Sequence, residues 1–200
     1  MDASHILTAF KVVPVVVVDD AEQACRLAEI LMAHGLNCIE VTLRTPGALD
    51  AINALHKQFP GLTLGAGSVT SLEQLKAVED MGAQFAVSPG STEELLASNF
   101  PIVPGGVTAT EVMQLRSKSY TTIKFFPAEL SGGLKYINAL SEPIPDVHFF
   151  PTGGINADNY ESYLAHERIT CVGGSWLAPI TDVRAGAWGK IEQRCAALGL

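Results

Sequence analysis

The sequence is poor in charged residues, in aromatic residues and in paired cysteine motifs. Charged residues make up 17% of the 200 residues and aromatic residues 7%, whereas hydrophobic residues make up 48%. Such a chain can bury a large core, which excludes general disorder. The cysteines, Cys25, Cys38, Cys171 and Cys195, form neither a CxxC pair nor a secreted-scaffold spacing. We therefore expect reduced thiols that pack as small hydrophobic groups.

Long hydrophobic runs are also missing. The longest run, residues 12–18, is too short to span a bilayer, and no signal peptide pattern precedes it. We therefore expect a cytoplasmic protein. The net charge of -8 gives an overall field that repels anions, which argues against nucleic acid or an anionic membrane as partner. An anionic substrate would need a local cluster of donors.

Motifs for metal and nucleotide chemistry are absent too. The five histidines form no HxH, HExxH or Cys/His cluster, so we expect no metal site. His148 begins an expected strand, and we assign it a structural role. No nucleophile elbow, P-loop or Rossmann fingerprint occurs.

Short apolar runs alternate with amphipathic stretches along the chain. The expected strands are residues 12–18, 38–43, 62–66, 84–88, 102–104, 122–126, 147–150 and 170–172. The expected helices include residues 21–33, 72–81, 92–98, 110–116, 156–165 and 183–197, with N-caps at Asp20, Ser71, Ser91 and Thr108. Eight such units predict an α/β protein with one domain over residues 1–200, a compact single (β/α)8 TIM barrel. The rival is a doubly wound open sheet, which usually has fewer strands and a Gly-rich first turn.

Charged residues interrupt the second expected strand, Cys38 to Arg44. Side chains alternate along a strand, so Glu40, Thr42 and Arg44 share one face. The other face is apolar and must pack on helices, which leaves the charged face inside the barrel. Glu40 and Arg44 then lie about 13 Å apart at roughly 3.3 Å per residue, too far for a simple ion pair. The alternative is a polar-layer glutamate and a solvated loop arginine.

Among the lysines, only Lys124 lies inside an expected strand with apolar neighbours on both sides. A buried ammonium is costly unless it pairs with a carboxylate or stays partly neutral. One interpretation is a structural pair with Glu40. The other is a nucleophile: a free amine can attack a ketone and form an iminium, with Glu40 shuttling protons and Arg44 holding a carboxylate. That set predicts chemistry on a 2-keto acid.

Two Gly-rich turns follow the last two expected strands, at residues 152–156 and 173–176. Backbone N–H groups at this place in a barrel commonly hold phosphate. The alternative is that both turns need glycine for conformation alone. Ser68 follows Gly65-Ala-Gly67 at the end of the third strand, where a ligand can approach the backbone.

Six segments resemble one family in order: Glu40-Val-Thr-Leu-Arg44, Gly65-Ala-Gly-Ser-Val69, Ser88-Pro-Gly90, Lys124-Phe-Phe-Pro-Ala-Glu129, Pro151-Thr-Gly-Gly154 and Gly173-Gly-Ser-Trp176. They resemble the 2-keto-3-deoxy-6-phosphogluconate (KDPG) aldolase family, which includes 4-hydroxy-2-oxoglutarate aldolases. The resemblance implies a homotrimeric barrel and a class I, Schiff-base mechanism that needs neither metal nor cofactor. It also implies cleavage of KDPG to pyruvate and glyceraldehyde 3-phosphate in the Entner–Doudoroff route.

The resemblance also implies roles for individual residues. Lys124 matches the Schiff-base lysine and Glu40 the general acid/base. The substrate-binding positions divide into three groups: Arg44, Ser68 and Thr152 for the pyruvyl part, Pro89 and Phe126 for the pocket walls, and Gly153, Gly154 and Ser175 for the phosphate. Ser68 stands where the family usually has threonine, which keeps the hydroxyl. Lys11, just before the first strand, either adds a cation near the mouth or is solvated.

Two other functions fit parts of this pattern. One is a phosphate-binding barrel isomerase or synthase without an imine, in which Lys124 acts only through its charge. The other is a sensor that binds phosphorylated sugars without turnover. Substrate preference among KDPG, its galactonate epimer and 4-hydroxy-2-oxoglutarate depends on the shape of the pocket.

Overall fold

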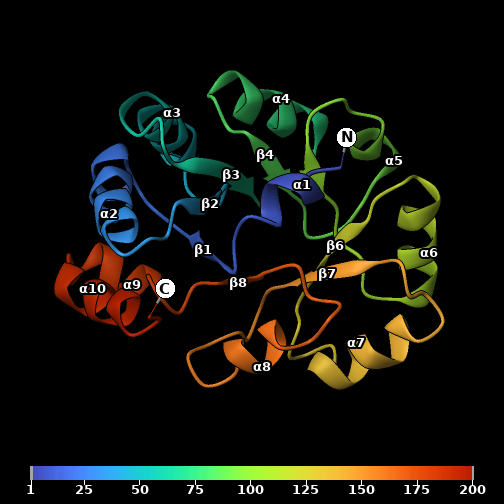
Figure 1. Ribbon diagram of the computed structural model, residues 1–200. Helices are drawn as coiled ribbons and strands as arrows, with labels where there is room; N and C mark the ends of the chain where they lie inside the picture. Colours follow the sequence, from blue (N-terminus) through green and yellow to red (C-terminus); the bar gives the residue numbers. More distant parts are fainter. Residues whose placement is uncertain (1, 200) are drawn as a thin grey trace.

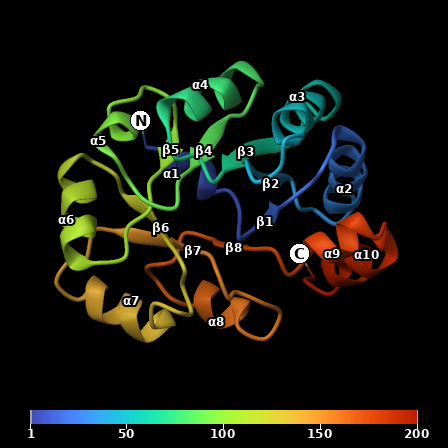
Figure 2. The ribbon, with the colours of Figure 1, turned by 180° about the vertical axis from the view of Figure 1, so that it is seen from behind.

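Eight parallel strands alternate with helices in the computed structural model, which describes residues 2–199 (Figure 1). The strands are β1 (Val12–Val16), β2 (Cys38–Thr42), β3 (Thr63–Gly67), β4 (Phe85–Val87), β5 (Ile102–Val103), β6 (Thr122–Phe125), β7 (His148–Pro151) and β8 (Val172–Gly174). The helices are α1 (Ser4–Leu7), α2 (Ala21–Ala33), α3 (Ala48–Gln58), α4 (Leu72–Asp80), α5 (Glu93–Leu96), α6 (Ala109–Ser117), α7 (Gly133–Ser141), α8 (Tyr160–Leu164), α9 (Ile180–Arg184) and α10 (Trp188–Ala196). From both sides, all helices except α1 lie around the outside of the strands (Figures 1 and 2).

The parallel strands form a curled sheet in which the strand order does not reverse. Six of them pair in the order β5-β4-β3-β2-β1-β8, and β6 pairs with β7. Isolated parallel bridges between Gly105 and Lys124 and between Thr152 and Gly173 connect the two sheets. A doubly wound sheet would reverse its strand order at a switch point, and this order lacks that reversal. The result is an α/β fold with a curled parallel sheet.

Alternation along the strands separates the buried residues into two clusters. The larger cluster includes Ile39, Val41 and Ile123, which point outward and pack with helix residues. The smaller one lies inside the curl of the sheet and consists of Ala3, Leu7, Val13, Cys38, Phe85, Val87, Val103, Phe150 and Cys171. Glu40 and Thr42 lie on the same face of β2 as Cys38, so the expected inward face of β2 is confirmed.

All four cysteines are free thiols, and Cys38, Cys171 and Cys195 are buried. Burial raises the pKa of the Cys38 and Cys171 thiols well above the usual range, and the nearby Glu40 carboxylate raises it further. These two side chains therefore stay protonated and pack as small apolar groups in the inner cluster.

The first helix closes one end of the curled sheet. Leu7 is fully buried in the inner cluster, with Ile6 and Phe10 packed against it. Asp2 fastens this segment, because its carboxylate accepts hydrogen bonds from Ser4 N at 3.0 Å and from Thr121 Oγ1 at 2.7 Å. The inner layer is therefore filled at this end, and a cavity can form only at the other.

Two helix boundaries differ from the sequence prediction. The segment 183–197 is not one helix: Gly186, at φ +62°, separates α9 from α10. Residues with a side chain rarely adopt this φ, which explains why glycine occupies the turn. The helix expected from Asn156 begins at Tyr160, because the Asn156 side chain accepts a hydrogen bond from Asp158 N at 2.8 Å and forms a turn instead.

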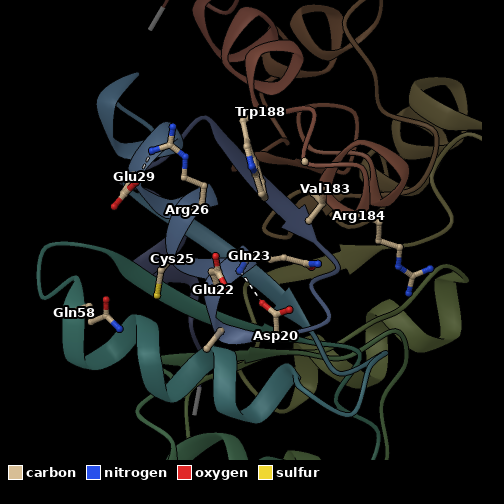
Figure 3. Close-up of a pocket in the computed structure, with 12 residues that line it drawn as sticks. Asp20, Glu22, Gln23, Cys25, Arg26, Glu29, Gln58, Val183, Arg184 and Trp188 are labelled. Atoms are coloured by element: carbon tan, nitrogen blue, oxygen red, sulfur yellow. Dashed lines mark hydrogen bonds and ion pairs between the residues drawn. The ribbon is translucent and has the colours of Figure 1, made fainter.

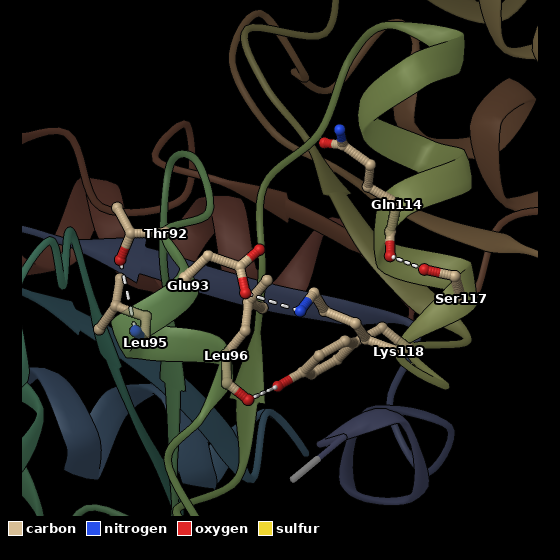
Figure 4. Close-up of polar contacts among 8 residues, drawn as sticks. Thr92, Glu93, Leu95, Leu96, Gln114, Ser117 and Lys118 are labelled. Carbon is tan, nitrogen blue, oxygen red and sulfur yellow. Dashed lines mark hydrogen bonds and ion pairs between the residues drawn. The ribbon is translucent and has the colours of Figure 1, made fainter.

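One cap and the bounds of several strands also differ, and β1 ends at Val16 rather than at residue 18. The cap expected at Ser91 is Thr92, whose hydroxyl accepts a hydrogen bond from Leu95 N at 3.3 Å (Figure 4). The short helix α5 is held further by an ion pair between Glu93 and Lys118 at 2.7 Å. The eighth strand covers Val172–Gly174 rather than residues 170–172. The caps expected at Asp20, Ser71 and Thr108 are confirmed.

Within residues 2–199, no helix is long and apolar enough to cross a membrane.

Replacing Leu7 tests the role of α1 in closing the inner layer. Leu7→Ala should lower the free energy of unfolding by about 2–5 kcal/mol, because it leaves a cavity in a fully buried cluster. Urea unfolding measures the change. His5→Ala, at an exposed position of the same helix, should stay within about 0.5 kcal/mol of the unmodified protein. Equal stability of the two variants would contradict the role of Leu7.

Candidate active site

A cavity of about 230 Å³ lies where the carboxyl ends of the strands converge. Its lining residues belong to β1, β2, β6 and β8 and to the loops after β2, β3, β4, β6, β7 and β8: Val15, Glu40, Thr42, Arg44, Ser68, Pro89, Lys124, Phe126, Thr152, Gly153, Gly173, Gly174 and Ser175. Active sites of parallel barrels form at this end, because loops of variable sequence meet there on a rigid frame.

Lys124 and Glu40 meet inside this cavity although 84 residues separate them in the sequence. The Lys124 Nζ lies 3.4 Å from the Glu40 Oε1, and the two side chains are 7% and 0% exposed. Charge-assisted hydrogen bonds in proteins are usually about 2.7–2.9 Å long. The contact between Lys124 and Glu40 is therefore longer than a typical charge-assisted hydrogen bond.

A glycine on the neighbouring strand makes the space for the Glu40 carboxylate. Gly67 lies beside β2 in the sheet, where it pairs with Thr42. A Cβ atom at Gly67 would lie 2.1 Å from the Glu40 Oε1, closer than atoms can approach. Any larger residue at position 67 must therefore displace the carboxylate.

Two buried polar atoms of the cavity have no hydrogen-bond partner among the described residues, namely Glu40 Oε2 and Thr152 Oγ1. An unsatisfied buried polar group costs about 1–3 kcal/mol, so each such atom calls for an explanation, and a role in binding a ligand is one. Both belong to side chains that line the cavity. This combination favours a site built for a polar ligand over a purely structural ion pair.

Arg44, Ser68 and Phe126 border the cavity from loops. Arg44 is exposed and donates from Nε to the Thr42 hydroxyl at 3.1 Å. Phe126 follows β6, and its ring centroid lies 5.4 Å from the Lys124 Nζ, within the range of a cation–π contact. Ser68 has φ +62°, a left-handed conformation that is uncommon for a residue with a side chain and recurs at ligand sites.

Nine of the ten residues that the sequence assigns to the site line the cavity; Gly154 does not. Its α-carbon faces the loop after β6, because a Cβ there would lie 2.5 Å from the Glu129 Cγ. Two lining residues, Val15 and Thr42, received no role in the sequence analysis, and Gly173 and Gly174 were included only as part of a Gly-rich turn. Alternation along β2 already placed Thr42 on the face of Glu40, and that signal was sufficient to include it.

A larger cavity of about 790 Å³ lies outside the sheet, between α2 and the segment containing α9 and α10 (Figure 3). Two of its lining side chains, Arg26 and Glu29, form an exposed ion pair at 2.8 Å. Lys11 borders another pocket and stands at the start of β1. That is the end of the strand opposite the active-site mouth, so Lys11 adds no cation there.

The sequence profile described as KDPG and KHG aldolase matches residues 3–194. The chain belongs to this aldolase family. It is 48% identical to the 2-dehydro-3-deoxy-phosphogluconate aldolase of Pseudoalteromonas atlantica, over 96% of this chain and 92% of the relative. It is 45% identical to the KHG/KDPG aldolase of Escherichia coli K12, over 96% of this chain and 92% of the relative.

A solved structure of the KDPG and KHG aldolase family has nearly the same fold. The KDPG aldolase of Legionella pneumophila, with pyruvate captured at low pH as a covalent carbinolamine intermediate, superposes with a TM-score of 0.93 at 41% identity. The alignment covers 98% of each chain. All lining residues of the cavity lie within the segment that matches the aldolase family.

Filling the space at Gly67 tests the packing around Glu40. Gly67→Ala should lower the free energy of unfolding by about 1–3 kcal/mol, because the added methyl group forces the buried carboxylate away from Lys124. Gly90→Ala is the control, since a Cβ at Gly90 meets no atom within 4 Å. Urea unfolding compares the two variants. A Gly67→Ala protein as stable as the Gly90→Ala protein would show that the carboxylate is not confined.

Proposed function

We propose that this chain is a class I aldolase that cleaves KDPG to pyruvate and glyceraldehyde 3-phosphate and also acts on 4-hydroxy-2-oxoglutarate. One observation carries the proposal: a buried lysine amine lies 3.4 Å from a carboxylate, and both side chains line one cavity. Within residues 2–199 the other oxygen of that carboxylate has no hydrogen-bond partner. Membership of the aldolase family supports it. The reaction is a carbon–carbon lyase reaction.

Lys124 is the proposed nucleophile. Its unprotonated amine attacks the C2 ketone of the substrate and forms a carbinolamine, which loses water to give an iminium. The iminium withdraws electrons from the C3–C4 bond. When Glu40 accepts the proton of the C4 hydroxyl, that bond breaks, the aldehyde leaves and an enamine remains. Protonation of the enamine at C3 and hydrolysis of the iminium release pyruvate and restore the amine.

The remaining residues are proposed to bind the substrate. Arg44, Ser68 and Thr152 hold the carboxylate end, and Pro89 and Phe126 form the walls. Gly153, Gly154 and Ser175 offer the phosphate site. Gly153 and Gly154 both have φ +89°, a backbone conformation that residues with side chains rarely adopt, which supports a role for the backbone of this turn. Gly154 contributes only through its backbone, because it does not line the cavity.

The proposed architecture is one compact (β/α)8 barrel domain over residues 1–200. The bridges from Gly105 to Lys124 and from Thr152 to Gly173 support closure of the sheet. A homotrimer and a place in the Entner–Doudoroff route are proposed from the family resemblance, and a cytoplasmic location stays a prediction.

Trapping with borohydride tests the imine. Borohydride with pyruvate should inactivate the enzyme and leave a covalent adduct on the peptide that contains Lys124, because reduction makes the imine permanent. Lys124→Ala should abolish pyruvate release from KDPG while the protein stays folded. Lys76→Ala, at a side chain 73% exposed, should behave like the unmodified enzyme.

Three results would exclude the imine mechanism. Continued turnover with borohydride and pyruvate would favour an isomerase or synthase that uses Lys124 only for its charge. Thermal stabilisation by phosphorylated sugars without pyruvate release would favour a sensor. An unmodified Lys124 peptide would exclude the imine directly. The same pyruvate-release assay, run at equal concentrations of KDPG, its galactonate epimer and 4-hydroxy-2-oxoglutarate, ranks the substrates.

Replacing Glu40 tests the proton transfer. Glu40→Gln should still form the trapped adduct with pyruvate but should lower kcat by about 10²–10⁴-fold, because the amide cannot accept the C4 hydroxyl proton. Steady-state kinetics and the trapping assay are compared on one preparation. Glu73→Gln, at an exposed position of α4, is the control. An unchanged kcat would remove Glu40 from the proposed role.

A further inference from the structure

Arg44 is held at a single point. Its Nε donates to the Thr42 Oγ1 at 3.1 Å, and within residues 2–199 its side chain forms no other hydrogen bond and no ion pair. The residue is exposed at the mouth of the cavity. A long side chain with so few contacts can adopt many rotamers, so its one hydrogen bond decides where the guanidinium points.

The Thr42 hydroxyl is itself oriented. It is buried at 2% exposure and donates to the Val16 carbonyl oxygen at 2.9 Å. A hydroxyl has one proton and two lone pairs. Because the hydroxyl donates its proton to a carbonyl oxygen of β1, one of its lone pairs can accept the hydrogen bond from the Arg44 Nε. Strand β1 thus orients the hydroxyl, and the hydroxyl orients the guanidinium.

Thr45 forms the same kind of bond nearby without reaching Arg44. Its hydroxyl donates to the Val18 carbonyl oxygen at 2.5 Å. The loop after β2 packs closely on the turn after β1, since a Cβ at Gly47 would lie 2.0 Å from the Asp19 carbonyl oxygen. Thr42 and Thr45 therefore both tie this loop to the end of β1, but only Thr42 bonds to the guanidinium.

We propose that Thr42 is a positioning residue that sets the orientation of Arg44 for its substrate carboxylate. A guanidinium has five N–H donors, one on Nε and four on the two Nη atoms. With Nε bound to Thr42, the Nη1 and Nη2 edge is the one offered to a carboxylate, which it can bind through two parallel hydrogen bonds. This inference rests on the proposed function, in which Arg44 binds the carboxylate of a 2-keto acid.

Removing the hydroxyl without changing the shape tests the proposal. Thr42→Val should raise KM for KDPG by about tenfold, the effect of a lost hydrogen bond to a charged group. It should change kcat by less than about threefold, because Arg44 binds the carboxylate equally well in the ground state and in the transition state. Thr42→Ser keeps the hydroxyl and should restore KM to within about threefold of the unmodified enzyme.

Two comparisons separate orientation of Arg44 from loss of loop structure. Thr45→Val removes the matching hydroxyl-to-carbonyl bond and should leave KM within about threefold. Arg44→Lys removes the Nε donor, so adding Thr42→Val to it should change KM less than about twofold further. The proposal is overturned if Thr45→Val raises KM as much as Thr42→Val, or if the effects of Thr42→Val and Arg44→Lys multiply.

The hydrogen bond can also be observed without kinetics. In ¹⁵N NMR of the unmodified protein, the Arg44 Nε–H signal, assigned by its loss in Arg44→Lys, should exchange slowly with water although the residue is exposed. Rapid exchange would overturn the proposal even if Thr42→Val failed to fold. An unmodified enzyme that releases no pyruvate from KDPG would instead refute the proposed function and leave this signal unaffected.

Discussion

The contact between Lys124 and Glu40 is the constraint on which the rest of the site depends. Taking an ammonium and a carboxylate out of water is costly, and their attraction repays this only with good geometry and further hydrogen bonds. Here the separation is 3.4 Å, and one carboxylate oxygen has no hydrogen-bond partner in the described part of the chain. The pair is thus incompletely satisfied by the protein itself, which is a poor arrangement for stability and a suitable one for binding a carbonyl compound.

The fold accommodates this pair by dividing the sheet interior into two layers. The lower layer is closed by apolar side chains, the protonated thiols of Cys38 and Cys171, and the first helix. The upper layer contains Glu40, Thr42 and Lys124 and opens into the cavity. The charged pair therefore lies between the apolar inner cluster and the cavity.

The cavity has a local excess of positive charge although the protein as a whole is negative. The protein carries a net charge of -8, yet the cavity contains Arg44 and Lys124 against one carboxylate. Local cations can attract an anionic ligand despite an unfavourable net charge, because dissolved salt screens charges that lie more than about 8–10 Å away. Glycines also occur in the loop after β7 and within β8. Side chains at these positions would occupy space that the neighbouring residues need.

Much of this arrangement could be predicted from local pattern. The alternation in residues 38–44 placed Glu40 and Thr42 inward, since successive strand side chains point to opposite faces. The apolar neighbours of Lys124 marked it as the buried lysine, and the order of the βα units indicated the parallel sheet. The interruption near Gly186, in contrast, was missed because the apolar periodicity continues through it.

Only the tertiary structure decided which segments meet. Sequence pattern sets the face on which a side chain lies but not its distance from a residue 84 positions away, which depends on how the sheet curls and in what register the strands pair. The sequence proposed that Lys124 and Glu40 act together, but their contact at 3.4 Å came from the fold. The space left by Gly67, the bond from Arg44 to Thr42 and the orientation of Gly154 came from the fold alone. Local alternation acts between neighbouring residues, whereas close approach is a property of the closed sheet.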